Sequence, residues 1–118
     1  MGLIAKGFVP LLLCQGGYTS RLETIAAIPK GKCIYWFENV DWTKAKEILG
    51  DTTCIRGGVP ASILFSGTTR QMKDCIKERI DIVGKGGGYI VDCGLWFDEA
   101  RPENVNTMVE FTKEYGVY

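Results

Sequence analysis

Hydrophobic and polar positions along this chain follow two alternating patterns. Four short runs, dense in apolar, aromatic and branched residues, predict strands: Val9–Cys14, Cys33–Phe37, Thr52–Arg56 and Tyr89–Cys93. Each run is followed by a segment with apolar residues at helical spacing: Thr19–Ile28, Asp41–Leu49, Thr68–Val83 and Pro102–Tyr115. This order predicts an α/β fold with a parallel sheet. Four such βα units are half of a TIM-type (β/α)8 barrel, so a half-barrel is expected.

Residues at the ends of these segments carry local signals. The run Val9–Cys14 is continuously apolar, which predicts a strand buried on both faces, and Gln15–Tyr18 is expected to end it. Ser20 and Glu23 have the spacing of a capping box at the start of the first helix. Asp41 is a good N-cap residue for the second helix.

Glycine-rich stretches separate several of these segments. Arg56–Pro60 is expected to be a loop, and Ser62–Ser66 a short additional helical turn. Lys85–Gly88 contains three consecutive glycines but closes a helix and enters a strand. A phosphate-binding loop does the reverse, so this stretch predicts a tight turn that needs unusual backbone angles.

Composition narrows the class of protein. The 118 residues are enough for one domain, residues 1–118, and the 14 basic and 14 acidic residues balance without a basic stripe, which argues against nucleic acid as a partner. No apolar run has the length of a membrane span, and no signal peptide is recognisable. Five scattered cysteines predict free thiols in a reducing cytoplasm. The chain contains no histidine, the commonest general base.

Candidate chemistry gathers after the predicted strands. In parallel α/β folds the carboxyl ends of the strands meet on one side of the sheet, where functional groups collect. That rule selects four stretches: Cys14–Tyr18, Glu38–Asn39, Arg56–Gly58 and Asp92–Gly94.

Two residues in these stretches are the candidates for catalysis. Arg56 could pair with a ligand carboxylate or phosphate; the alternative is a structural ion pair with Glu38 or Asp92. Asp92 could act as a general base or hold polar groups of a ligand; the alternative is hydrogen bonding to neighbouring loop amides.

Other residues in and near these stretches are candidates for binding. Cys14 and Cys93 could be soft metal ligands, or both could be small buried hydrophobic residues. Four aromatic residues could stack on a flat ligand: Tyr35, Trp36, Trp42 and Trp96. Tyr35 and Trp36 are expected instead to alternate between the two sheet faces as core, so Trp96 is the best candidate for stacking. The remaining candidate ligand-binding residues are Gln15, Tyr18, Glu38 and Gly57.

Several spaced motifs, in order, resemble the uroporphyrinogen decarboxylase superfamily. They are Leu49-Gly50-Asp51, Ile55–Leu64, Gly67-Thr68-Thr69, Gly84–Ile90 and Arg101–Val105. The resemblance runs from Val9 to Tyr118 and is to the C-terminal half of the family's eight-unit barrel. It implies a decarboxylase (a lyase of porphyrin biosynthesis) or a corrinoid-dependent methyltransferase, with a tetrapyrrole, a corrinoid or a corrinoid protein as partner.

The chain departs from the family pattern at two places. Where the family has a histidine in a Gly-His-Gly loop, this sequence has Cys93-Gly94-Leu95. The zinc-dependent methyltransferases have a His-x-Cys pair, which would fall here on Cys14 and Gly16. The resemblance therefore implies a corrinoid or zinc as cofactor only with an altered ligand set.

The expected function follows from the half-barrel. Two open sheet edges and an uncovered interior favour association, either as a homodimer or with a separate N-terminal half. The leading hypothesis is a tetrapyrrole- or corrinoid-linked decarboxylase or methyltransferase, incomplete alone. The alternative is a non-catalytic binding or assembly half, or a truncated remnant without activity.

Overall fold

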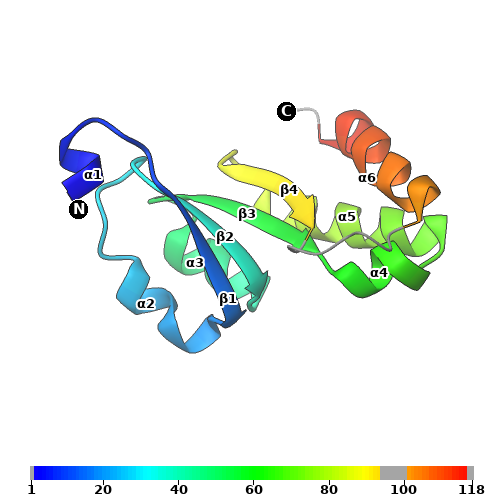
Figure 1. Ribbon diagram of the computed structural model, residues 1–118, viewed down its shortest axis with the longest axis horizontal. Coiled ribbons are helices and arrows are strands. Elements are labelled where there is room, and N and C mark those ends of the chain that lie inside the picture. The colour runs from blue at the N-terminus through cyan, green and yellow to red at the C-terminus, as the bar shows by residue number, and fades with distance from the viewer. Residues whose placement is uncertain (1, 94–100, 117–118) are drawn as a thin grey trace.

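The computed structural model describes residues 2–93 and 101–116, and the side chains of Gln15 and Gly16 lie outside that description. In this part of the chain, strands and helices alternate as expected (Figure 1). The strands are β1 (Leu11–Gly17), β2 (Ile34–Asn39), β3 (Cys54–Val59) and β4 (Tyr89–Cys93). The helices are α1 (Gly2–Ala5), the 3-10 turn η1 (Thr19–Arg21), α2 (Leu22–Ile25), α3 (Trp42–Leu49), α4 (Ala61–Ser66), α5 (Thr69–Val83) and α6 (Pro102–Tyr115).

The four strands form one parallel sheet in the order β1-β2-β3-β4. The chain therefore crosses the sheet once, from β1 at one edge to β4 at the other (Figure 1). The paired positions Leu13, Trp36, Arg56 and Ile90 form a row across all four strands. This arrangement confirms the predicted α/β fold of four βα units and is consistent with half of a TIM barrel.

Helices cover one face of the sheet, and the core lies between the two. Tyr35, Phe37 and Ile55 point to this helix-covered face, where they pack with Leu22 and Leu49. A second cluster lies farther along the sheet and joins the end of β3 and β4 to α4, α5 and α6: Val59, Leu64, Met72, Ile76 and Cys93. Among the described residues no helix is long and apolar enough to cross a membrane.

Helix starts follow the cap signals at two places. The Asp41 side chain accepts a hydrogen bond from the Lys44 amide at the start of α3, as predicted. At the start of α5, Thr68 and Gln71 form a reciprocal capping box. These bonds satisfy amides that the first helical turn leaves without intrahelical partners.

The first predicted helix is wrong in extent and in its cap. Thr19–Ile28 divides into η1 and the four-residue α2, and no side-chain cap bond is present at Tyr18 or Arg21, so the Ser20–Glu23 capping box is absent. Two contacts from outside the segment explain this. Thr19 Oγ1 accepts a hydrogen bond from the Asp41 amide, and Tyr35 Oη donates to the Ile25 carbonyl at 2.7 Å. Hydrogen bonds to residues distant in the sequence thus hold this segment where a continuous helix was expected.

Two strands continue through glycines that were expected to be loops. β1 runs to Gly17, and β3 runs through Gly57 and Gly58 to Val59. Gly57 and Gly58 have φ of 124° and 107°, which L side chains rarely adopt, so the strand keeps its pairing here because both residues lack a Cβ. The Gly86–Gly88 turn also has positive φ at each residue, as its sequence predicts.

Strand β1 is not buried on both faces, which corrects the prediction from its apolar run. Leu11, Leu12 and Leu13 are 42%, 45% and 38% exposed. The reason is its position: β1 is an edge strand, and in the described chain nothing covers the face of the sheet opposite the helices.

Candidate functional site

Strand alternation places the candidate polar residues on the face opposite the helices, which we call the inner face. Because Tyr35 and Phe37 point to the helices, Trp36 between them points the other way. The same alternation places Arg56 and Asp92 on the inner face, beside Ile55 and Val91 on the helix-covered face.

Arg56, Asp92 and Trp36 form one connected cluster on the inner face. Arg56 Nε donates to Asp92 Oδ2 at 2.5 Å, and the Arg56 guanidinium carbon lies 4.2 Å from the centre of the Trp36 ring. Trp36 Nε1 donates to the Cys93 carbonyl at 3.2 Å. The Arg56 and Asp92 side chains are 28% and 20% exposed, so both remain within reach of a ligand. The ion pair with Asp92, one of the two structural alternatives for Arg56, is thus present.

Asp92 also makes a local bond. Its Oδ1 accepts from the Cys93 backbone amide at 2.8 Å, while its other oxygen bonds Arg56. The Cys93 thiol also donates to Oδ1, at 3.6 Å. The carboxylate is therefore oriented by three donors, one of them an adjacent amide as the structural alternative expected. Oriented carboxylates next to a cation suit hydrogen bonding to a ligand, or proton transfer if the ion pair opens.

The part of β3 that follows Arg56 adds no side chain to the inner face, because the next two residues are Gly57 and Gly58. A Cβ on Gly57 would lie 2.5 Å from the Phe37 carbonyl oxygen, and one on Gly58 would lie 2.3 Å from the Tyr89 hydroxyl, so a side chain at either position would force a neighbour to move. Donors from the helix side fix the two glycine carbonyls: Tyr89 Oη donates to Gly57 O at 2.7 Å and Arg79 Nε to Gly58 O at 3.1 Å. The strand end beside Asp92 is therefore bare backbone, which a ligand can approach closely.

The other predicted binding residues do not join this cluster as a group. Tyr18 packs on the helix-covered side, with its ring centre 6.0 Å from that of Phe37 and the Arg21 guanidinium 5.6 Å away. Glu38 is exposed near the end of β2, where alternation assigns it to the inner face. The side chain of Gln15 and all of Trp96 lie outside the described residues.

Comparison with known proteins accounts for this architecture. A family model described as uroporphyrinogen decarboxylase (URO-D) matches residues 5–115. The chain belongs to the uroporphyrinogen decarboxylase family. It is 28% identical over 114 residues to a uroporphyrinogen decarboxylase of Chlorobium phaeovibrioides, an alignment that covers 90% of this chain but 31% of the relative. The chain thus spans about a third of the length of that relative and is a distant, partial homologue.

This family is a TIM barrel, so the inner face of a uroporphyrinogen decarboxylase-like half corresponds to the barrel interior. Active sites of TIM-barrel enzymes lie at the carboxyl ends of the strands. Asp92, near the end of β4, and the Gly57–Gly58 backbone, near the end of β3, lie there. Sequence reasoning favoured a core position for Trp36 over a place in the site. The signal available in the sequence was the alternation along the strand, which turns Trp36 to the face opposite Tyr35 and Phe37.

The two cysteines predicted as metal ligands are not neighbours in this uroporphyrinogen decarboxylase-like chain. Cys14 lies in the first core cluster on β1 and Cys93 in the second on β4, at opposite edges of the sheet. Three strand spacings separate them, about 14 Å. Burial raises the pKa of both thiols, which disfavours the thiolate that a metal binds. The pair does not fit a zinc ion, and none of the five cysteines forms a disulfide.

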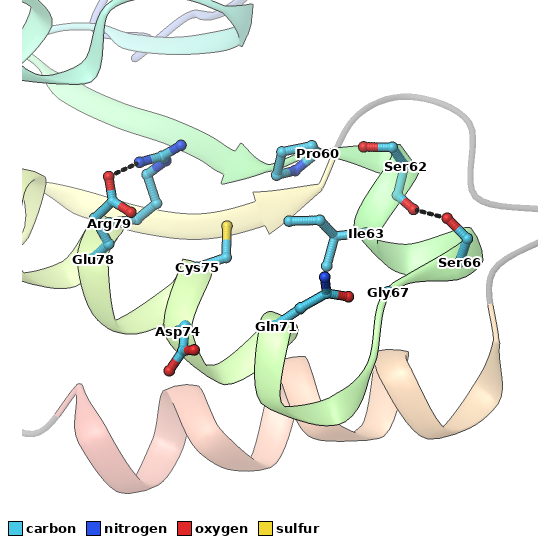
Figure 2. Close-up of a pocket in the computed structure, with 10 residues that line it drawn as sticks. All are labelled: Pro60, Ser62, Ile63, Ser66, Gly67, Gln71, Asp74, Cys75, Glu78 and Arg79. Carbon is cyan, nitrogen blue, oxygen red and sulfur yellow. Dashed lines mark hydrogen bonds and ion pairs between the residues drawn. The ribbon is translucent and has the colours of Figure 1, made fainter.

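A groove on the outside of the uroporphyrinogen decarboxylase-like half-barrel was not predicted. It has a volume of about 510 Å³ between α4 and α5, and Figure 2 shows Cys75 and Ile63 on its walls and Glu78 paired with Arg79. It is lined by Pro60, Ser62, Ile63, Ser66, Gly67, Gln71, Asp74, Cys75, Glu78 and Arg79. Arg79 and Cys75 both hydrogen-bond the Gly58 carbonyl, so these two groove residues also support the end of β3.

Proposed function

We propose that this chain is the ligand-facing half of a uroporphyrinogen decarboxylase-like barrel, which binds a tetrapyrrole or a corrinoid once a second half covers its inner face. The second half is either another copy of the chain or a separate N-terminal half. The observation that supports this is the Arg56–Asp92–Trp36 cluster on the inner face. A ligand with carboxylates and a flat ring has complementary groups, since guanidinium binds carboxylate and indole stacks.

Each residue has a role in this proposal. Arg56 exchanges its bond from Asp92 to a ligand carboxylate, and the exposure of both side chains keeps this exchange inexpensive. Asp92 is then available to hydrogen-bond the ligand or to carry a proton. Trp36 lies under the guanidinium and fixes its plane.

The finer assignment is decarboxylation or methyl transfer by the completed barrel. In decarboxylation a proton replaces the departing carboxyl group. We assign its delivery to Asp92, the carboxyl group within the cluster, after Asp92 has taken up a proton from solvent. A corrinoid or a corrinoid protein would be the partner in methyl transfer. No step is assigned to zinc, because Cys14 and Cys93 lie at opposite edges of the sheet.

Titration of the purified chain with uroporphyrin, followed by Soret absorbance, tests the binding proposal. Arg56→Ala should weaken binding by about tenfold or more, because a charge-assisted hydrogen bond contributes about 1.5–3 kcal/mol. Asp92→Ala should change the affinity as well, and cobalamin serves as the alternative probe. The matched control is Arg70→Ala, an arginine on α5 whose side chain is 92% exposed.

Equal affinity of the Arg56→Ala, Asp92→Ala and unmodified proteins would contradict this site. If the chain binds uroporphyrin but does not decarboxylate uroporphyrinogen, the result would favour the second candidate, a non-catalytic binding or assembly half. The absence of histidine from the sequence and the mutual satisfaction of Arg56 and Asp92 favour that candidate. Inspection of neighbouring coding sequence for a missing N-terminal half is a further discriminating observation.

A further inference from the structure

The chain exposes more surface than a compact protein of its mass. Its accessible surface is 7162 Å², whereas its mass is 13.1 kDa. Folded monomers of that mass expose about 6,400 Å², so the excess is about 800 Å² per chain. Two such excesses total about 1,600 Å², the size of a standard stable protein interface. The excess per chain is thus comparable with the area that each partner contributes to such an interface.

Exposed apolar side chains lie where such an interface would form. Leu11, Leu13 and Ile90 are on the inner face, and each is about 40% exposed. Leu12 is on the other face of β1, because it pairs with Tyr35, which points to the helices. At 45% exposure, Leu12 is a half-exposed leucine on an edge strand of the sheet.

The opposite edge of the sheet carries a groove lined mainly by apolar residues. Between β4 and α6 lies a groove of about 230 Å³, lined by Val91, Met108, Val109, Thr112 and Lys113. Val109 is 42% exposed there, and Thr112 Oγ1 is buried without a hydrogen-bond partner among the described residues. In a β/α barrel, the helix after one strand also packs on the next strand. The place of that next strand beside β4 is open in the described chain.

We propose that a second copy of this chain docks on both edges, related by a twofold axis that runs along the strands. A half turn about that axis keeps all strands parallel and places β1 of each copy beside β4 of the other. The head-to-tail contact closes after two copies and gives eight parallel strands. The Leu12 side chain of each copy then enters the Val91–Val109 groove of the other.

Charge on the inner face is compatible with this closure. Arg56 and Asp92 form an ion pair within each copy, so closing the barrel traps no unpaired charge at this position. The proposal rests on the part of the proposed function in which association completes the barrel, and it commits to a second copy as the occupant. It does not depend on which ligand binds.

Sedimentation velocity of the full chain over a range of concentrations is the first measurement, and a dimer of the 13.1 kDa chain is expected. Leu12→Glu and Val109→Glu should each raise the dimer dissociation constant at least tenfold. Both side chains are exposed in the single chain, so the variants should still fold, which far-UV circular dichroism checks. The control is Thr43→Glu, which adds the same charge at an exposed position on α3, in the middle of the helix layer.

A charge-pair variant tests the seam directly. In Leu12→Glu/Val109→Lys, the new carboxylate of each copy meets the new ammonium of the other, so association should recover relative to either single substitution. Leu12 and Val109 belong to opposite edges of the same sheet, so this recovery requires two molecules.

Three results would overturn the proposal. The first is a monomer at all concentrations, which would leave a separate half as the occupant. The second is a dimer that Leu12→Glu and Val109→Glu do not weaken. The third is an open series of larger oligomers. Failure of porphyrin binding in an intact dimer would contradict the proposed function but not this interface, so the two failures are distinguishable.

Discussion

The helix-covered face and the inner face of this sheet are built from the same four strands, yet they differ in completeness. On the helix-covered face, Tyr35, Phe37 and Ile55 are at most 4% exposed. On the inner face, Leu11, Leu13 and Ile90 are about ten times more exposed. The alternation of side chains in a strand supplies apolar residues to both faces, but the described chain supplies helices to only one. The contrast teaches that the two faces have different tasks: the helix-covered face stabilises the fold, and the inner face is left open and carries the candidate site.

The largest expected effect comes from the covered face. Phe37 is 1% exposed, and its ring lies 6.0–6.4 Å from the rings of Tyr18, Tyr35 and Trp42. Phe37→Ala should therefore lower the free energy of unfolding by about 3–5 kcal/mol. Urea denaturation at a concentration where the chain is monomeric measures it.

Leu13→Ala is the matched control on the inner face. Leu13 is 38% exposed, so its truncation should cost about 1 kcal/mol or less in the monomer. Equal losses of unfolding free energy for the two variants would show that the inner face is as well packed as the helix-covered face, contrary to the comparison.

The second prediction concerns how α6 is attached to α4 within the helix layer. Asn104 is 1% exposed, and its Nδ2 lies within 3.2 Å of the Ile63, Leu64 and Gly67 carbonyl oxygens. Asn104→Leu leaves these acceptors without that donor, and we expect a loss of about 2 kcal/mol in unfolding free energy. Asn106→Leu, exposed on the same helix, is the control and should be nearly neutral. Similar melting of both variants would argue against the three-carbonyl clamp.

The third prediction uses pH to test burial of Tyr35. Burial, reinforced by the neighbouring Cys33 and Cys14 thiols, raises the pKa of Tyr35 to about 12 from its usual 10.0. Above pH 10 the unfolded chain loses the phenolic proton while the folded chain keeps it. Stability is therefore complete below pH 10 and falls up to about pH 12, with a slope of about 1.4 kcal/mol per pH unit while only the unfolded chain is ionised.

Tyr35→Phe separates this effect from that of the cysteines. The variant loses the hydrogen bond to the Ile25 carbonyl, so it should be less stable near neutral pH by about 1 kcal/mol. Its stability should then decline less steeply between pH 10 and 12. The thiols, whose pKa values burial also raises, should still contribute a decline that begins near pH 9. An unchanged slope would show that the phenol is accessible in the folded chain.

Sequence was sufficient for the elements of the fold whose signals are local. Asp41 caps α3 because its side chain bonds an amide three residues on, which sequence spacing alone specifies. The order of strands and helices likewise follows from periodicity. Thr19–Ile28 could not be predicted, because its structure depends on Asp41 and Tyr35, which are distant in sequence. The continuation of β3 through Gly57 and Gly58 depends equally on Tyr89 and Arg79.

The candidate site shows the same limit. Arg56 and Asp92 were identified from predicted strand ends, which is wrong for Arg56 because β3 continues past it to Val59. Their pairing was one of two structural alternatives until the register placed them on adjacent strands. Cys14 and Cys93 satisfied the same strand-end rule, but alternation turns both toward the helices. The position of a residue along a strand therefore indicates how close it lies to the carboxyl end of the sheet. The alternation of side chains decides which face of the sheet the residue points to.

The smallest effect belongs to the inner face and bears on ligand binding. In a double-mutant cycle, Arg56→Met and Asp92→Asn should show a coupling of about 1 kcal/mol in unfolding free energy, because the paired side chains are 28% and 20% exposed. Arg70 and Asp74, 3.9 Å apart and largely exposed, are the control pair and should show no measurable coupling. A coupling several times larger would mean that a ligand cannot separate Arg56 from Asp92 cheaply, and the pair would then be a structural element of the barrel wall. A small coupling leaves Arg56 able to exchange one carboxylate for another, which is what the proposed binding of an anionic ligand requires.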